Sequence, residues 1–221
     1  SASQPRLQDL GNPFMADLPN EVDVVVVGGG VMGASTAFHL AEAGVSVLLV
    51  EKNELASGST SKAAGGVRAN FSDELNIAMG ARSLDLLADF PNRPGQEIDL
   101  HRPGYMFALS TPEDVELFEK STALHIAAGV ESRMLTPQEA KQLNPLLEIE
   151  GILAASFTPN DGYCTPESVV LGYASGARKH GATVMTQTEA TDIEVVDGQI
   201  VSVTTSAGKV KTKTVINCAG A

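Results

Sequence analysis

Cysteine and long apolar runs are scarce in this sequence. Its 221 residues include two cysteines, Cys164 and Cys218, which are too few for a disulfide framework or a cysteine-based metal cluster. We therefore expect two buried thiols in a reducing compartment, a cytoplasmic location and no metal site. No apolar run approaches the roughly 18 residues of a membrane span, and no charged-then-apolar signal segment is present. These absences predict that the chain has no membrane span.

Basic residues are also few. Fifteen lysines and arginines stand against 27 aspartates and glutamates, so the formal net charge is −12. Because nucleic acids and anionic membranes attract positive surfaces, this balance argues against both as partners. The length fits one large domain or two small ones and is enough to bury a core. Composition leaves the oligomeric state open.

The first 22 residues are polar and aperiodic, and we interpret them as a tail. Met15 could be a native start, so residues 1–14 are left out of the fold prediction. The pattern of a folded domain begins at Asp23.

Residues 23–51 carry the strongest pattern, DVVVVGGGVMGASTAFHLAEAGVSVLLVE. It is typical of a strand, a glycine turn, a helix, a second strand and an acid. The β-branched run 24–27 suits a strand buried on both faces. We predict a helix over 31–43, which Gly44 ends, and a second strand over 45–50.

Three glycines in this stretch, Gly28, Gly30 and Gly33, form a G-x-G-x-x-G. They allow a tight turn, close approach of a pyrophosphate, and close packing of the helix, whose N-terminus favours anions. Glu51 lies about 20 residues further on, where a carboxylate accepts hydrogen bonds from ribose hydroxyls and repels a 2′-phosphate. The stretch predicts a dinucleotide site that disfavours NADP and leaves FAD and NAD open.

A long segment rich in Gly, Ser, Thr and Ala follows, KNELASGSTSKAAGGVRAN. A plain NAD-binding domain would supply a third strand here. The small residues could instead pass close to a flat cofactor and donate N–H and hydroxyl groups. Composition alone fits a flexible surface loop equally well.

Capping signals mark the helices that come next. Ser72 is the predicted N-cap of one helix, and threonine precedes proline at Thr111, Thr136 and Thr165, which predicts three more helix starts. Glu139 completes a capping box with Thr136. The predicted helices cover 73–90, 112–128, 137–144 and 166–180, with strands over 105–109 and 151–157 and a turn over 159–164.

The end of the sequence predicts a β meander. Asp197 and Gly198 form a hairpin turn. Lys209, Lys211 and Lys213 alternate, which indicates a solvated strand face. The predicted strands cover 183–188, 191–196, 199–205 and 209–216.

Together these motifs resemble the FAD-dependent amino-acid oxidase and dehydrogenase family, which includes D-amino acid oxidase, glycine oxidase, sarcosine oxidase and dimethylglycine dehydrogenase. The glycine motif occurs in many flavoproteins, whereas its combination with the Gly/Ser segment and the final AGA is specific. The resembling stretches are VVVVGGGVMGASTAFHLAEAGVSVLLVEK at 24–52, ASGSTSKAAGGVR at 56–68, HRPGYMFAL at 101–109, NDGYCTPESVV at 160–170 and VINCAGA at 215–221.

The resemblance implies an α/β fold. A Rossmann-like FAD-binding domain of the glutathione-reductase type would be interrupted by part of an α+β substrate domain, which explains the missing third strand. Residues 23–100 would be the first part of the FAD-binding domain, 101–160 a substrate-domain segment, and 161–221 the returning helix and meander. Because family members continue past the AGA strand, we expect this chain to be the N-terminal portion of a longer protein, inactive alone, whose C-terminal part is missing.

The resemblance also implies roles for individual residues. The glycine turn would hold the FAD pyrophosphate, Glu51 the adenosine ribose, and the Ala190 backbone the adenine. Covalent relatives carry a histidine near the position of Lys62, so the lysine predicts non-covalent FAD. The implied cofactor-binding residues are Gly28, Gly30, Val31, Met32, Gly33, Glu51, Lys52, Ser59, Thr60, Ser61, Ala64, Gly65, Gly66, Ala190, Ala219 and Gly220.

The implied reaction oxidises the C–N bond of an amine or amino acid, of the sarcosine, glycine or D-amino acid type, by hydride transfer to flavin N5. A guanidinium matches two carboxylate oxygens, so Arg68 is the candidate for the substrate carboxylate, with a structural or flavin-facing role equally open. His101 and Tyr163 could line the site, although packing is the simpler interpretation. The other histidines are interpreted as surface or packing residues: His39, His125 and His180.

Two other functions stay open. A flavin-binding assembly or scaffold protein without turnover would carry the same cofactor motifs. An NAD-dependent dehydrogenase is disfavoured by the Gly/Ser segment and the late meander.

Overall fold

A computed structural model describes residues 17–220, so Met15 and the excluded residues 1–14 lie outside the described part. The described chain divides into two compact units. Within it, no helix is long and apolar enough to cross a membrane. The first unit comprises the described residues up to Ala63, Pro94–Gln96 and those from Pro166 on, and the second comprises Ala64–Arg93 and Glu97–Thr165.

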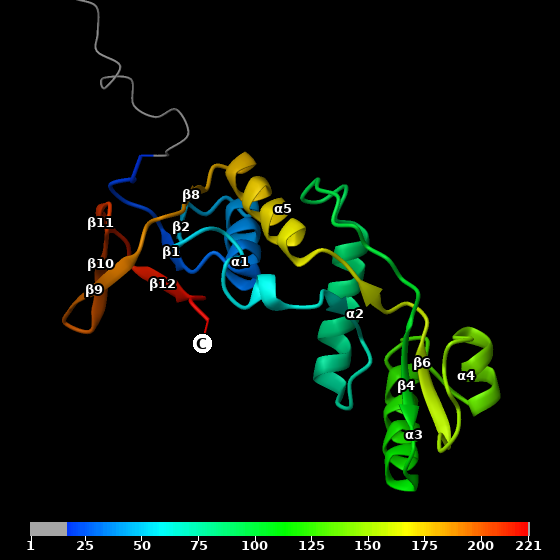
Figure 1. The fold of residues 1–221 in the computed structure, drawn as a ribbon. Coiled ribbons are helices and arrows are strands. Elements are labelled where there is room, and N and C mark those ends of the chain that lie inside the picture. The colour runs from blue at the N-terminus through cyan, green and yellow to red at the C-terminus, as the bar shows by residue number, and fades with distance from the viewer. Residues whose placement is uncertain (1–16, 221) are drawn as a thin grey trace, which may run out of the picture. The chain divides into compact units, whose positions relative to one another are not determined.

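A four-stranded parallel sheet forms the centre of the first unit (Figure 1). Its order is β12-β1-β2-β8, with β1 Val24–Val27, β2 Val47–Val50, β8 Thr183–Met185 and β12 Thr214–Asn217. The predicted strand over 183–188 is therefore shorter and pairs in parallel with β2, outside the meander. Because β8 and β12 come from the far end of the sequence, the expected interruption of the nucleotide fold is confirmed.

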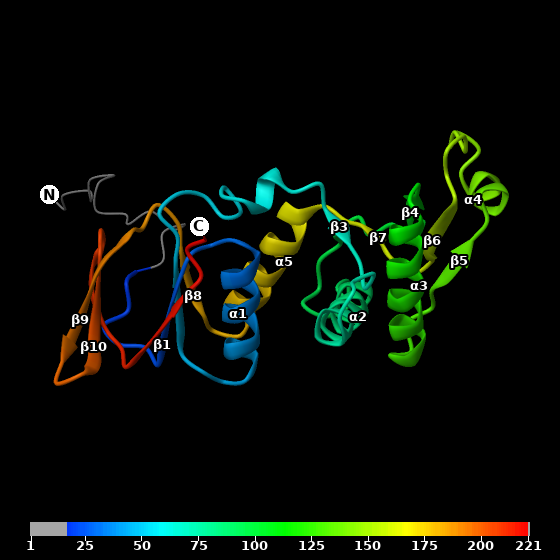
Figure 2. The ribbon, with the colours of Figure 1, turned by 90° about the horizontal axis from the view of Figure 1, so that it is seen from below.

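Two layers cover this sheet (Figure 2). Helices α1 (Val31–Glu42) and α5 (Pro166–Lys179) pack together against it. An antiparallel meander lies on the other side, with β9 Ala190–Val196, β10 Gln199–Thr205 and β11 Gly208–Lys211 in the order β11-β10-β9. The buried cluster that joins the meander to the parallel sheet includes Val25, Leu48, Val50, Val203 and Val210.

The predicted strand over 209–216 is wrong as a single element, because it forms β11 and β12 in different sheets. Between them, the buried Thr212 hydroxyl lies 3.0 Å from the carbonyl oxygens of both Asp23 and Thr214. These contacts redirect the chain from the meander to the parallel sheet. Alternation of lysines carries no information about such a turn.

The second unit is α+β. Its antiparallel sheet has the order β4-β6-β5, with β4 Tyr105–Leu109, β6 Ala154–Thr158 and β5 Arg133–Leu135. Helices α3 (Pro112–Ala127) and α4 (Pro137–Leu143) contact this sheet, and a separate ladder pairs β3 (Gly66–Val67) with β7 (Gly162–Tyr163), beside α2 (Glu74–Ala88). A buried cluster in this unit contains Leu135, Ala140, Ala155 and Phe157.

The structure tests the capping predictions. Thr136 and Glu139 form the predicted capping box at the start of α4. Ser72 as the N-cap of α2 is wrong, because the cap is Asp73, whose carboxylate accepts a backbone hydrogen bond at 3.0 Å. Strands β3, β5 and β7 were not predicted, and the predicted turn over 159–164 contains β7. Runs of two or three residues are too short to show alternation.

The predicted functional parts and the compact units divide the chain at different places. The second unit begins at Ala64 and ends at Thr165, whereas the predicted substrate segment covers 101–160. Packing defines the units and cofactor contact defines the predicted parts, so the assignment of residues 64–100 to cofactor binding stays a prediction.

One carboxyl group is fully buried in the second unit. The Asp161 oxygens accept hydrogen bonds from the backbone amides of Ala69 and Asn70. Burial raises the pKa of Asp161, and these amides, His125 and Arg68 offset the shift only in part. The folded state therefore holds this proton more tightly than the unfolded chain does.

Asp161→Asn should change how stability depends on pH. As the pH rises from about 4, where an unperturbed aspartate titrates, through the raised pKa, the wild type should lose stability relative to the variant. The reason is that the folded state binds more protons than the unfolded state in that window. Urea unfolding of both proteins over a pH series measures the free energy of unfolding of the wild type minus that of the variant. This difference should fall as the pH rises, and a rise would contradict the assignment.

Gly33→Ala should destabilise the first unit. A Cβ at Gly33 would lie 1.8 Å from the carbonyl oxygen of Gly28, so α1 would have to move away from β1. We expect the free energy of unfolding to fall by about 1–3 kcal/mol in chemical denaturation. Gly58→Ala is the matched control, because nothing lies within 4 Å of its added Cβ. Equal losses in both variants would show that the contact is unimportant.

Candidate functional site

The glycine turn joins β1 to α1. Gly28 has a φ of 111°, and a Cβ there would lie 2.3 Å from the carbonyl oxygen of Cys218. Gly30 is the N-cap of α1, which has no side-chain cap and no acid in its first turn. Val31 and Met32, at the start of the helix, are 38% and 69% exposed. This helix start is accessible and suits the pyrophosphate of a dinucleotide, because first-turn amides lack partners within a helix.

One hydroxyl of the small-residue segment reaches the turn. The Val31 amide donates to Thr60 Oγ1 at 3.2 Å. Thr60 opens the short 3-10 helix η2 (Thr60–Lys62), and Ser59 and Ser61 on either side of it are exposed. The structure therefore brings Thr60 to the predicted pyrophosphate position and leaves the two serines facing solvent.

Glu51 follows β2, and both of its carboxylate oxygens have backbone partners. Oε2 accepts from the Gly29 amide at 2.7 Å and Oε1 from the Asn53 amide at 2.8 Å. Each oxygen keeps a second lone pair for a ribose hydroxyl. Gly29 is absent from the predicted site. A Cβ at Gly29 would lie 2.8 Å from the Glu51 Cβ, so glycine lets the two residues approach. The run of three consecutive glycines is the sequence feature that could have identified Gly29. Lys52 beside Glu51 is exposed.

The end of β12 lies against the glycine turn. The Cys218 amide donates to the backbone of β1 at 2.7 Å, and the Ala219 nitrogen lies 2.8 Å from where a Cβ of Gly28 would be. Gly220 follows with a φ of 83°. Ala190 starts β9 and packs against the core between the sheet and the meander. The structure thus brings Ala219 to the turn and places Ala190 elsewhere in the first unit.

Three predicted cofactor residues belong to the second unit. Ala64 is exposed, whereas Gly65 is buried and its carbonyl oxygen accepts a backbone hydrogen bond at 2.9 Å. Gly66 pairs with Tyr163 in the β3–β7 ladder. A Cβ at Gly66 would lie 2.3 Å from the Tyr105 hydroxyl, so a larger residue here would require the tyrosine side chain to move. Contact of these residues with a cofactor stays a prediction.

Arg68 follows β3, and its guanidinium lies among three aromatic rings. Its Cζ is 5.1 Å from the ring centroid of Phe71, 5.8 Å from that of Tyr105 and 5.5 Å from that of Phe107. In the described part of the chain, no residue forms a hydrogen bond or ion pair with the guanidinium. The rings attract the cation, and its N–H donors are left for a planar anion. No spacing in the sequence signals Asp161, which holds the backbone just after Arg68.

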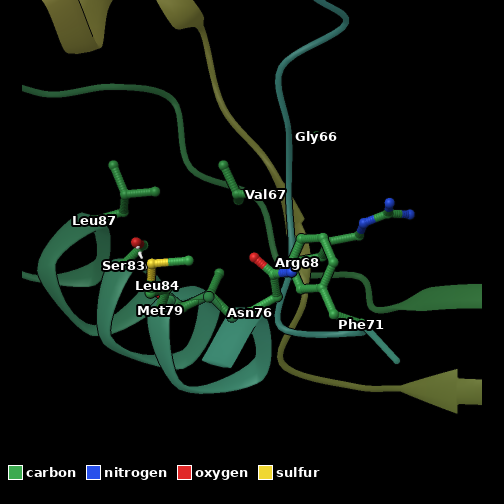
Figure 3. Close-up of a pocket in the computed structure, with 10 residues that line it drawn as sticks. Gly66, Val67, Arg68, Phe71, Asn76, Met79, Ser83, Leu84 and Leu87 are labelled. Atoms are coloured by element: carbon green, nitrogen blue, oxygen red, sulfur yellow. Dashed lines mark hydrogen bonds between the residues drawn. The ribbon is translucent and has the colours of Figure 1, made fainter. Parts of the chain in front are cut away.

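The two faces of β3 differ (Figure 3). Val67 points towards α2, whereas the Arg68 side chain points away from it. A pocket of about 350 Å³ lies between β3 and α2, and its lining includes Met79 and Leu87. Val67 and Arg68 both belong to the lining of this pocket, although their side chains point in different directions.

The other candidate residues, His101 and Tyr163, are exposed and contact each other. His101 and Tyr163 pair across an isolated bridge and stack with ring centroids 5.1 Å apart, and His101 Nε2 lies 2.9 Å from Asp99 Oδ1. Both cysteines are free. Burial raises the pKa of Cys164, which lowers its reactivity, whereas Cys218 is only half-buried, so the expectation of two buried thiols holds for Cys164 alone.

Comparisons with known proteins agree with this arrangement. A family model described as FAD dependent oxidoreductase matches residues 23–221. Mitochondrial dimethylglycine dehydrogenase of Rattus norvegicus is 32% identical, over 94% of this chain and 24% of that protein. Glycine oxidase of Geobacillus kaustophilus is 30% identical, over 80% of this chain and 48% of that protein. The crystal structure of L-proline dehydrogenase from P. horikoshii shares a TM-score of 0.88 and 34% identity, over 92% of this chain and 54% of that one.

The match runs through both units, and the chain spans about a quarter of the dimethylglycine dehydrogenase and about half of the other two proteins. The helix start without a side-chain cap, the Glu51 carboxylate and the close-packed glycines fit FAD, the cofactor of the matching family. The chain therefore belongs to the FAD dependent oxidoreductase family of amino-acid oxidases and dehydrogenases.

Proposed function

We propose that the protein oxidises the C–N bond of an amine or amino acid, of the sarcosine, glycine or D-amino acid type, with FAD as the cofactor. Arg68 carries this proposal, because its guanidinium is flanked by three rings and pairs with no acid of the described residues. Such a cation suits a carboxylate, whose two oxygens match the guanidinium fork. Glycine, proline and dimethylglycine, in the names of the three relatives, each carry a carboxylate one carbon from the amine.

The chain's own residues would divide the work. The β1–α1 turn would hold the pyrophosphate at the α1 amides, and Glu51 would accept hydrogen bonds from the ribose. Arg68 holds the substrate carboxylate and so orients the neighbouring C–N bond. When bound, FAD would supply the acceptor for the hydride, and the imine product would be hydrolysed by water.

Release of FAD by acid tests the mode of attachment. Lys62 is exposed at the end of η2, where covalent relatives would carry a histidine, and a lysine at this position predicts non-covalent FAD. Acid precipitation of the purified yellow protein should therefore move the flavin absorbance into the supernatant. Flavin that stays in the pellet would show a covalent link and would contradict this assignment.

Arg68→Met should impair amino acids selectively. Loss of the guanidinium removes a charge-assisted pair, so we expect kcat/KM for an amino acid to fall by about 30-fold or more. Oxidation of an amine without a carboxylate should change little. Anaerobic flavin reduction by matched pairs, such as proline and pyrrolidine, measures both.

Arg82→Met is the matched control, because Arg82 is an exposed arginine of the same unit, on α2. Equal losses for both members of a pair in Arg68→Met would contradict the carboxylate role. Absence of reduction by any amine or amino acid in the FAD-loaded wild type would favour a flavin-binding scaffold without turnover.

A further inference from the structure

The backbone that follows Arg68 is buried. Ala69 is 1% exposed and Asn70 is 5% exposed, although Arg68 itself is only half-buried. A buried backbone needs hydrogen-bond partners, and here side chains from distant elements supply them. This segment decides where the Arg68 side chain leaves the main chain.

Asp161 supplies two of these partners. Its Oδ1 accepts from the Ala69 amide at 2.9 Å and its Oδ2 from the Asn70 amide at 3.3 Å. Asp161 lies between β6 and β7 and is itself held by its carbonyl oxygen, which accepts from the Gly104 amide at 3.0 Å. One carboxyl group therefore binds two consecutive amides from a fixed position.

Two further side chains hold the same segment. The Asn70 side-chain amide donates to Thr158 Oγ1 at 2.7 Å, at the end of β6. His125 of α3 is fully buried, and its Nε2 lies 2.7 Å from the Phe71 carbonyl oxygen while its Nδ1 lies 3.0 Å from Ser132 Oγ. Because a carbonyl oxygen only accepts, Nε2 carries the proton.

Helix α2 closes the other side of the segment. A Cβ at Gly80 would lie 2.7 Å from the Arg68 carbonyl oxygen and 2.9 Å from the Ala69 Cα. The backbone from Arg68 to Phe71 is thus fixed by contacts with β6, α3, α2 and the β6–β7 turn. Displacement of this backbone would move the guanidinium away from the rings of Tyr105 and Phe107 on β4.

We propose that Asp161 is a positioning residue for anion binding at Arg68, acting through the amides of Ala69 and Asn70. This inference rests on the proposed function, because it assumes that Arg68 receives the substrate carboxylate. Asp161 does not touch the substrate. It fixes the backbone from which the guanidinium extends.

Asp161→Asn tests the proposal with little change of shape. An asparagine amide nitrogen would face one of the two backbone amides, so that donor loses its acceptor and the segment loosens. The probes are propionate and propionamide, which have the same shape and differ in charge. Ligand-observed NMR titration of the FAD-loaded protein gives both dissociation constants, and hydrogen exchange of the Ala69 and Asn70 amides reports the loosening.

We expect the wild type to prefer propionate, and Asp161→Asn to weaken propionate about tenfold, which is one missing or misplaced hydrogen bond to a charged group. Propionamide should bind equally to both proteins, and exchange of the two amides should accelerate. Leu135→Ala is the control for general loss of stability, because it opens the buried cluster around β5 in the same unit. It should leave the ratio of the two dissociation constants unchanged.

If Asp161→Asn left the ratio of the propionate and propionamide dissociation constants at its wild-type value, the inference would be overturned. It would also be overturned if Leu135→Ala changed this ratio as much as Asp161→Asn does. If Asp161→Asn does not fold, Thr158→Val removes the acceptor of the Asn70 side chain without changing its volume much. It should shift the ratio in the same direction by about threefold, half the logarithmic effect of the aspartate variant, and an unchanged ratio would again overturn the inference.

Arg68→Met separates the two proposals. If it keeps the wild-type preference for propionate, the carboxylate role of Arg68 fails, whatever Asp161→Asn does. If it abolishes the preference while Asp161→Asn leaves it intact, only the positioning role of Asp161 fails.

Discussion

The first unit depends on a close contact that leaves no room for side chains. Gly28 lies against the backbone of Cys218, and Gly33 lies against the carbonyl oxygen of Gly28. These contacts bring β1, α1 and β12 together, so the last strand must sit beside the first. Since parallel neighbours require a long crossover, the chain between β2 and β12 is free to build the second unit and the meander before it returns.

In the second unit, buried polar contacts rather than close-packed glycines fix the position of the candidate functional side chain, Arg68. Strand β3 has only two residues, and the side chains of Val67, at its end, and of Arg68, just after it, point in different directions. Val67 points towards α2, whereas the Arg68 guanidinium lies among aromatic rings, and both residues line the pocket between β3 and α2. A ladder this short cannot fix its own geometry, so buried polar groups on β6, α3 and the β6–β7 turn hold the segment that follows.

Local chemistry explains which features the sequence could predict. The glycine turn, Glu51 and the capping box at Thr136 arise from residues close in the sequence, and the structure shows each of them. The split of residues 209–216 depends on the Thr212 hydroxyl reaching Asp23, which is 189 residues away. Asp161 similarly meets Ala69 across 92 residues. Spacing and periodicity give information about residues that are close in the sequence, so they cannot predict long-range polar contacts of this kind.

The buried carboxyl group of Asp161 is better explained by its role in orienting a backbone segment than by a contribution to the stability of the fold. Its raised pKa means that desolvation outweighs the favourable effect of the two amides, His125 and Arg68 on the charged form. A neutral, apolar packing of the same space would avoid that cost but would leave the Ala69 and Asn70 amides without acceptors. A carboxyl group is short, and its two oxygens can accept from consecutive amides at once. The residue therefore suits a place where the direction of one backbone segment, and of the arginine before it, has to be fixed.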